Sequence, residues 1–261
     1  MPDHLRLAVV PTEGRDEFAV EIHINGVEMT AKGAGLGMDP FDVLVPTNQF
    51  AADDPATIPV ARCECGVYGC GMTDVSITRA DGEVRWQWLK ERPIRTPSVF
   101  DAHQYDAEVQ RAAGDFAWET PVRTAGRLVR TRADVRAALA ANDLRIDWTD
   151  SHEGPFQVCL AYRHSLQILL RFEWAGRTPE ALADHVIETL RDTPPTRWRA
   201  AWHASDRAVP GPPPFAGPRG SPGSSRRPRG TPSPRAGGRP RPRWRSRRRG
   251  RPDRCRPSGP T

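Results

Sequence analysis

Residues 75–88 of the chain read VSITRADGEVRWQW, with apolar and polar side chains alternating on both sides of Asp81-Gly82. An Asp-Gly pair between two such runs is typical of a two-residue hairpin turn. Because this turn fixes the register, two pairs fall on the apolar face, Ile77 opposite Trp86 and Val75 opposite Trp88. We therefore predict a β-hairpin whose tryptophans anchor a hydrophobic core.

A second hairpin is predicted nearer the N-terminus, around Asn25-Gly26. Its register places His23 opposite Glu28 on the solvent face, where a cross-strand pair is a more ordinary role for histidine than catalysis. The opposite face should be apolar and should carry Val20, Ile22, Ile24, Val27 and Met29.

The second half of the chain combines helix and strand patterns. Asp101 can cap a helix with Gln104 at the third position, and another helix is predicted over residues 132–141 with Thr131 as its cap. A further helix should start at Thr178-Pro179 and stop at Pro194. Three apolar runs indicate strands at 144–148, 156–162 and 166–174, the last two covered on both faces. Hairpins followed by strands with covering helices predict an α+β fold.

Charge is divided unevenly along the chain. Residues 208–261 hold 15 arginines and one acidic residue, which gives +14, whereas residues 1–207 have 23 basic and 31 acidic residues, which gives −8. The first part lacks the basic surplus typical of nucleic-acid binding. The Arg/Pro/Gly-rich second part cannot bury a core. We expect a single α+β domain over 1–207, or two packed subdomains over 1–95 and 98–207, followed by a disordered tail over 208–261.

Two interpretations of the tail remain open. A genuine basic arm would bind phosphates through counterion release, so that any nucleic-acid binding would belong to it. The other interpretation is that the tail is a frameshift product. Over the whole chain, arginine outnumbers lysine 36 to 2. Such usage indicates GC-rich coding DNA, in which a shifted frame also yields Pro, Arg, Gly and Ser. The abrupt change of composition favours the frameshift, and no function is assigned to the tail.

The sequence predicts a cytoplasmic protein without a membrane partner. No stretch approaches the roughly 18 apolar residues of a membrane helix. Residues 1–18 lack a basic segment followed by an apolar run. In the cytoplasm thiols stay reduced, so disulfides are not expected.

Three of the five cysteines lie in residues 63–71, CECGVYGCG. Cys65 and Cys70 have a spacing found in zinc sites, and the glycines between them permit a sharp turn. Cys63 can join them only if the chain bends at Glu64-Cys65, because residues two apart in an extended chain point to opposite faces. A fourth ligand would have to come from a distant position, with four candidates: Cys159, His103, His152 and His164.

The alternative is that these thiols pack as small hydrophobic side chains in a turn and that no cofactor is bound. The incomplete ligand set favours this alternative over zinc.

The pattern CECGVYGCG at 63–71, followed by the hairpin TDVSITRADGEVRW at 73–86, resembles that of a group of proteins from high-GC bacteria. The likeness covers residues 22–88 and, more weakly, the helix–strand region downstream. No activity is known for that group, so the resemblance implies no functional residue. It does imply that such a protein ends soon after residues 194–198, in keeping with a frameshifted tail.

A second candidate site contains Asp147, Asp150 and His152, which could supply the acid/base pair of a hydrolase. The same residue types are ordinary in a turn between strands. No complete catalytic motif is present, so we expect a non-enzymatic module that binds a protein partner. Its alternatives are a zinc-binding protein with a site at Cys63, Cys65 and Cys70, and a hydrolase.

Overall fold

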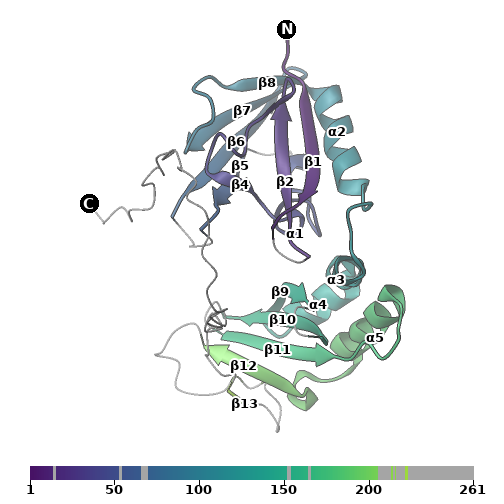
Figure 1. Cartoon of the computed structure of the whole chain (residues 1–261). Helices are drawn as coiled ribbons and strands as arrows, with labels where there is room; N and C mark the ends of the chain where they lie inside the picture. The colour runs from purple at the N-terminus through teal and green to yellow at the C-terminus, as the bar shows by residue number, and fades with distance from the viewer. Residues whose placement is uncertain are drawn as a thin grey trace, which may run out of the picture. The chain divides into compact units, whose positions relative to one another are not determined.

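The computed structural model describes residues 1–13, 16–52, 55–65, 70–151, 154–163, 166–204, 213, 215 and 221–222. Within these residues lie three β-sheets, with antiparallel sheets in the first half of the chain and longer helices later (Figure 1). The predicted α+β class is confirmed.

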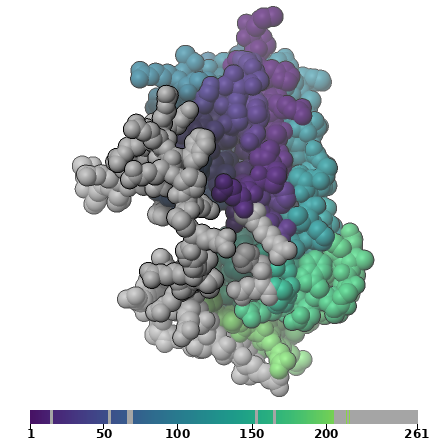
Figure 2. Space-filling view, viewed as in Figure 1, coloured from purple at the N-terminus to yellow at the C-terminus, as the bar shows by residue number. Residues whose placement is uncertain are grey.

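Two sheets form the first half. The first has the order β1 (Leu5–Pro11), β2 (Phe18–Ile24), β3 (Val27–Glu28). The second has the order β4 (Gly35–Gly37), β5 (Ala56–Cys63), β6 (Met72–Ala80), β7 (Glu83–Lys90), β8 (Ser98–Asp101). Short helices α1 (Pro40–Val43) and η1 (Gln49–Ala51) separate β4 from β5. Helix α2 (Ala102–Gly114) lies beside β1 in Figure 1, and their side chains meet without a visible gap in Figure 2.

The β6–β7 hairpin has the predicted register, with Ile77 opposite Trp86 and Val75 opposite Trp88. Both tryptophans are buried, and the Trp86 ring stacks on Phe50 with centroids 5.8 Å apart. Each indole N–H has an acceptor: Trp86 donates to the Tyr105 hydroxyl (3.3 Å), and Trp88 donates to the Ser98 hydroxyl (3.1 Å). Trp86 and Trp88 are therefore buried without leaving an indole N–H unsatisfied.

The Asn25-Gly26 hairpin also has the predicted pairs, but two details differ. Val27 is 39% exposed, because β3 is a two-residue edge strand that nothing covers on that side among the described residues. His23 contacts the Glu21 carboxylate at 3.0 Å. Its cross-strand neighbour Glu28 turns away and accepts from the backbone N–H groups of Thr30 (2.6 Å) and Ala31 (2.8 Å).

The second half contains the third sheet, with the order β13 (Ser221–Pro222), β12 (Ala200–Ala204), β11 (Leu166–Phe172), β10 (Phe156–Tyr162), β9 (Leu144–Asp150). Helices α3 (Pro121–Thr131), α4 (Ala133–Ala140) and α5 (Pro179–Asp192) gather on one side of it in Figure 1, and η2 (Pro195–Arg197) follows α5. Every residue of β10 is buried, as predicted. Strand β11 instead alternates between buried and more exposed positions, so only one face lies fully in the core.

Most helix caps follow the sequence. Asp101 accepts from the N–H of Gln104 (3.0 Å), and Thr178 accepts from that of Ala181 (3.3 Å). The predicted Thr131 cap is wrong, because Thr131 ends helix α3 and its hydroxyl donates to the Arg127 carbonyl (2.8 Å). Helix α4 begins after Arg132 without a side-chain cap.

The predicted domain boundaries stay predictions. Buried hydrophobic residues form two clusters, one spanning Leu5 to Ala112 and the other Ala125 to Ala200. Beyond residue 207, Phe215 packs its ring on Tyr162 with centroids 5.2 Å apart, and β13 pairs with β12. Apart from Pro213, the rest of 208–261 lies outside the described residues.

Candidate metal centre

The ladder between β5 and β6 brings Cys63 and Cys70 to the same end of the second sheet. Arg62 pairs with Met72, and the N–H of Cys63 donates to the carbonyl of Gly71 (3.1 Å). Cys63 ends β5, and Cys70 lies just before β6 begins. The two strands therefore place these cysteines at the two ends of one loop, whose residues 66–69 lie outside the described part of the chain.

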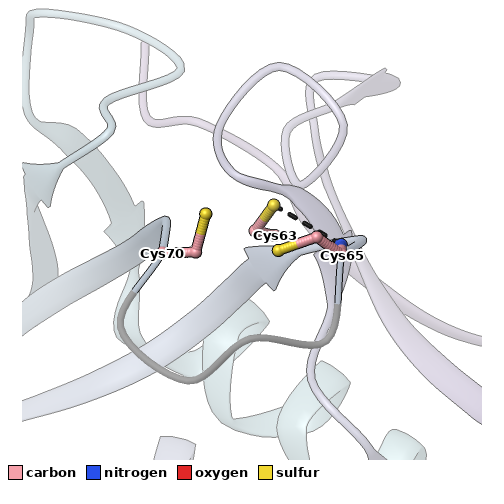
Figure 3. Close-up of side chains that lie close together, drawn as sticks. All are labelled: Cys63, Cys65 and Cys70. Carbon is pink, nitrogen blue, oxygen red and sulfur yellow. Dashed lines mark hydrogen bonds between the residues drawn. The ribbon is translucent and has the colours of Figure 1, made fainter. Parts of the chain in front are cut away.

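The sulfur atoms of Cys63, Cys65 and Cys70 all lie within 4.8 Å of one another. Figure 3 shows the Cys65 side chain turned back toward the other two. The bend at Glu64-Cys65 that this requires is present as a turn. Thiolates bound at about 2.3 Å to one tetrahedral zinc ion would be about 3.8 Å apart, so the sulfurs need to approach by at most about 1 Å. The cluster could hold a metal ion.

The local environment suits a metal-bound thiolate. The backbone N–H of Cys65 donates to the sulfur of Cys63 at 3.5 Å (Figure 3). An N–H donor stabilises the negative charge that a ligating sulfur carries. Cys63 and Cys70 are half-buried and Cys65 is exposed, so an ion could reach the cluster from solvent.

Glu91 places a carboxylate beside this cluster. A Cβ added to Gly71 would lie 2.8 Å from Glu91 Oε1 and 3.4 Å from Cys63 Cβ, so both side chains lie against the same glycine. The β6–β7 register positions Glu91, whose N–H donates to the Met72 carbonyl at 3.2 Å. Carboxylate oxygen is an accepted zinc ligand. The Glu91 carboxylate oxygens do not belong to the group of ligand atoms within 4.8 Å of one another, so Glu91 could complete the set only if its side chain rotates toward the sulfurs. The sequence did not suggest Glu91, because only the strand pairing brings it near the cysteines.

Glu64 lies between two of the cysteines but contacts a different neighbour. Its Cγ would lie 3.4 Å from a Cβ at Gly35, the residue of β4 that pairs with Cys63. Glu64 follows the end of β5 and Glu91 follows the end of β7, so the two glutamates reach this region from different strand ends.

The fourth ligands suggested by the sequence are not part of the cluster where they are described. Cys159 is a buried residue of β10, where burial, helped by Asp147, raises the pKa of its thiol to about 12. It is therefore a neutral side chain at physiological pH. His103 lies on α2 and does not join the group formed by the three sulfurs. His152 and His164 fall outside the described residues.

Asp147 and Asp150 both lie in β9 and both have structural contacts. Asp147 accepts from the Gln167 amide (3.0 Å) and lies 3.6 Å from Arg145, and Asp150 accepts from the N–H of Ser151 (2.6 Å). The third predicted member, His152, is not described. The hydrolase interpretation stays a prediction, and these contacts add no support for it.

A groove of about 620 Å³ lies next to the cysteine cluster, over β1, β2 and β4. Five glutamates line it, and none of its described lining residues is lysine or arginine; the glutamates are Glu13, Glu17, Glu21, Glu28 and Glu64. Glu64 joins the groove to the cluster. Five of the 31 acidic residues of 1–207 therefore lie together on this face.

No family model matches the chain, and no solved structure does. Part of the chain is similar to the phenyloxazoline synthase MbtB of Mycobacterium tuberculosis, strains CDC 1551 / Oshkosh and ATCC 25618 / H37Rv, and of Mycobacterium bovis. Each match is 34% identical over 89 residues, which are 33% of this chain and 6% of the relative. Because the match spans so little of these synthases, it brings no reaction to this chain.

No helix of the described residues has both the length and the apolar character needed to cross a membrane.

Proposed function

We propose that this protein binds a zinc ion through Cys63, Cys65 and Cys70, with Glu91 as the fourth ligand. The proposal rests on the convergence of three sulfurs from both ends of the β5–β6 loop. Four protein ligands around zinc are typical of structural sites, whereas catalytic sites keep one position open. The proposed role is therefore a structural one, in keeping with a non-enzymatic protein.

The competing interpretation, packed thiols without metal, meets a difficulty at Cys65. A thiol that acts as a small hydrophobic side chain gains free energy by leaving water. Cys65 is an exposed residue, so packing away from water gives its side chain little reason to turn toward the other two. Coordination would give one, and a set of three thiolates and one carboxylate suits zinc.

Metal analysis of the purified, tag-free full chain tests the proposal. We expect one zinc per chain. Cys65→Ser and Cys70→Ser should each lose the metal, and Glu91→Gln should weaken zinc binding by about 10-fold or more, since the loss of a residue that only supports a metal ligand already costs that much. Glu64→Gln is the matched control, because it removes a nearby carboxylate that contacts Gly35 instead, and it should retain zinc.

The pH dependence has a definite sign. Thiolate ligands must be deprotonated, so acidification adds protons to sulfur and releases zinc. Zinc content should therefore fall as pH is lowered from 7. Metal-free protein as purified, with no uptake of added zinc, would support the packed-thiol interpretation. Equal losses in Glu91→Gln and Glu64→Gln would contradict the assignment of Glu91 alone.

A second candidate function, binding of a protein partner, is supported by the acidic groove. A groove with five glutamates and no basic residue among its described lining favours a basic peptide segment. The test is titration of the full chain with an arginine-rich peptide and a glutamate-rich peptide of equal length. Binding of the basic peptide should weaken with added salt and in Glu17→Gln/Glu21→Gln. Binding of the basic peptide that is unchanged in Glu17→Gln/Glu21→Gln would contradict this candidate, whereas the glutamate-rich peptide reports on the arginines of residues 208–261.

A further inference from the structure

A second cavity, of about 320 Å³, opens between α4 and the first residues of β9. This volume is at the small end of the roughly 300–1,000 Å³ range of ligand pockets. Its lining surface is largely apolar and includes Leu139, Leu144 and Ile146 together with three arginines, Arg130, Arg136 and Arg145. None of its described lining residues is acidic. The composition of this cavity differs from that of the glutamate groove. Most of its lining residues are also far from the three clustered cysteines in the sequence.

Arg130 is a buried cation whose hydrogen-bond acceptors are neutral. The residue is 8% exposed, and its two Nη atoms donate to the carbonyl oxygens of Asp147 (3.0 Å) and Phe41 (3.2 Å). Its Nε is buried with no hydrogen-bond partner among the described residues. The guanidinium also lies 5.1 Å from the centre of the Phe41 ring.

The charge of Arg130 is only partly compensated. Burial lowers the pKa of Arg130, and the more distant carboxylates of Asp42, Asp39 and Asp147 oppose that shift. No carboxylate of the described residues forms an ion pair with it. A buried cation in this state is stabilised when an anion comes close.

The other two arginines are available at the same cavity. Arg136 is exposed and makes no ion pair with a described residue. Arg145 has a side chain that is 67% exposed, and its contact with Asp147 is long, 3.6 Å. Both guanidinium groups can therefore turn toward a ligand.

We propose that this cavity binds a small amphipathic carboxylate. Its short apolar chain would lie against Leu139, Leu144 and Ile146, and its head would be held by the arginines. Arginine forks match a carboxylate with two parallel hydrogen bonds. A neutral apolar ligand would leave the cations uncompensated, and an inorganic anion would leave the apolar walls uncovered.

Calorimetric titration of the full chain with octanoate tests this proposal. We expect saturable binding of one octanoate per chain. 1-Octanol lacks the charge and acetate lacks the chain, so each should bind at least about 10-fold more weakly, as the loss of charge-assisted hydrogen bonds or of apolar contact requires. No saturable binding of octanoate, or equal binding of 1-octanol, overturns the proposal.

Two variants locate the site. Arg136→Gln should weaken octanoate binding by about 10-fold, and Ala140→Phe should abolish it by filling the cavity from an exposed position of its lining. Arg171→Gln is the control, because Arg171 is an exposed arginine of β11 outside the cavity, and its affinity should be unchanged. Arginines of the tail are unaltered in all three variants. Octanoate binding that survives both cavity variants places the site elsewhere and overturns the proposal.

Discussion

Replacing Glu108 tests how α2 is held against β1. The Glu108 carboxylate accepts from the N–H of Leu7 (2.7 Å) and receives both Nε (2.8 Å) and Nη2 (2.6 Å) of Arg111. Arg111 also donates to the Leu7 carbonyl at 2.6 Å. Glu108 is only 9% exposed, so these hydrogen bonds are largely shielded from water. Its single carboxylate links strand β1 to helix α2, about 100 residues apart in the chain.

The pKa of Glu108 fixes the sign of the effect. Burial acts to raise this pKa, but the hydrogen bonds from Arg111 and from the Leu7 N–H outweigh it, so the pKa lies below its ordinary value of 4.5. A lowered pKa in the folded state means that the ionised carboxylate stabilises the fold. This stabilisation is fully present above pH 4.5 and is lost as pH falls through the folded-state value.

Glu108→Gln separates charge from shape. Glutamine keeps an oxygen for the Leu7 N–H but opposes Arg111 with an N–H₂ group, so we expect a loss of about 1.5–3 kcal/mol in unfolding free energy at pH 7, the range of hydrogen bonds to charged groups. Urea unfolding followed by tryptophan fluorescence measures it, and the difference from wild type should close toward pH 3. Asp115→Asn, a control at an exposed contact 3.5 Å from Arg111, should change stability by less than about 1 kcal/mol. A Glu108→Gln deficit that stays constant between pH 7 and pH 3 would refute the reasoning.

Two further predictions concern packing, and thermal unfolding followed by far-ultraviolet circular dichroism checks both. Trp86→Ala should cost about 3–5 kcal/mol, whereas Gln87→Ala on the opposite face should cost less than about 1 kcal/mol; a larger loss in the glutamine variant would mean an inverted strand. Gly37→Ala should destabilise by about 1–3 kcal/mol, because its Cβ would lie 2.2 Å from the Val20 carbonyl oxygen of β2. Gly114→Ala, with open space at the end of α2, should be neutral or stabilising by up to about 1 kcal/mol, and equal effects at both glycines would contradict the close approach of β2 and β4.

The sequence predicted the elements whose information is local. Asp81-Gly82 sets the register of β6 and β7 because a two-residue turn leaves no freedom in pairing, and every predicted pair of that hairpin is present. The caps at Asp101 and Thr178 follow for the same reason, since each satisfies an N–H three residues away.

Helix α3 was missed although its sequence, PVRTAGRLVRT, is strongly amphipathic. Val122, Ala125 and Val129 recur at helical spacing on one face, so the pattern itself was readable. Gly126 is required by packing, because a Cβ there would lie 2.5 Å from Thr149 Oγ1 and 3.1 Å from the Phe41 ring. A second available signal was Thr120-Pro121, a cap followed by proline at the first helical position. The cap and the apolar stripe together predict this helix, and the sequence interpretation did not use them.

The sequence predicted the three cysteines of the candidate metal site, Cys63 on the condition of a bend at Glu64-Cys65, but it did not suggest Glu91. Cys63 and Glu91 come near the other cysteines through the β5–β6 and β6–β7 ladders. Both ladders are held by strand pairing and by the buried Trp86 and Trp88, which do not need a metal ion. Small zinc domains unfold when the metal is removed, because the ion supplies their folding free energy.

In this protein the metal-free chain should stay folded. Chelation should therefore leave the near-ultraviolet circular dichroism of the tryptophans unchanged at 25 °C while lowering the melting temperature, since an ion that binds only the folded state stabilises it by mass action. The Cys70→Ser variant should give the same spectrum as chelated wild type. Loss of the tryptophan signal on chelation would show that the strand ladders depend on the ion. That result would contradict the inference that the ladders form first and position the metal ligands.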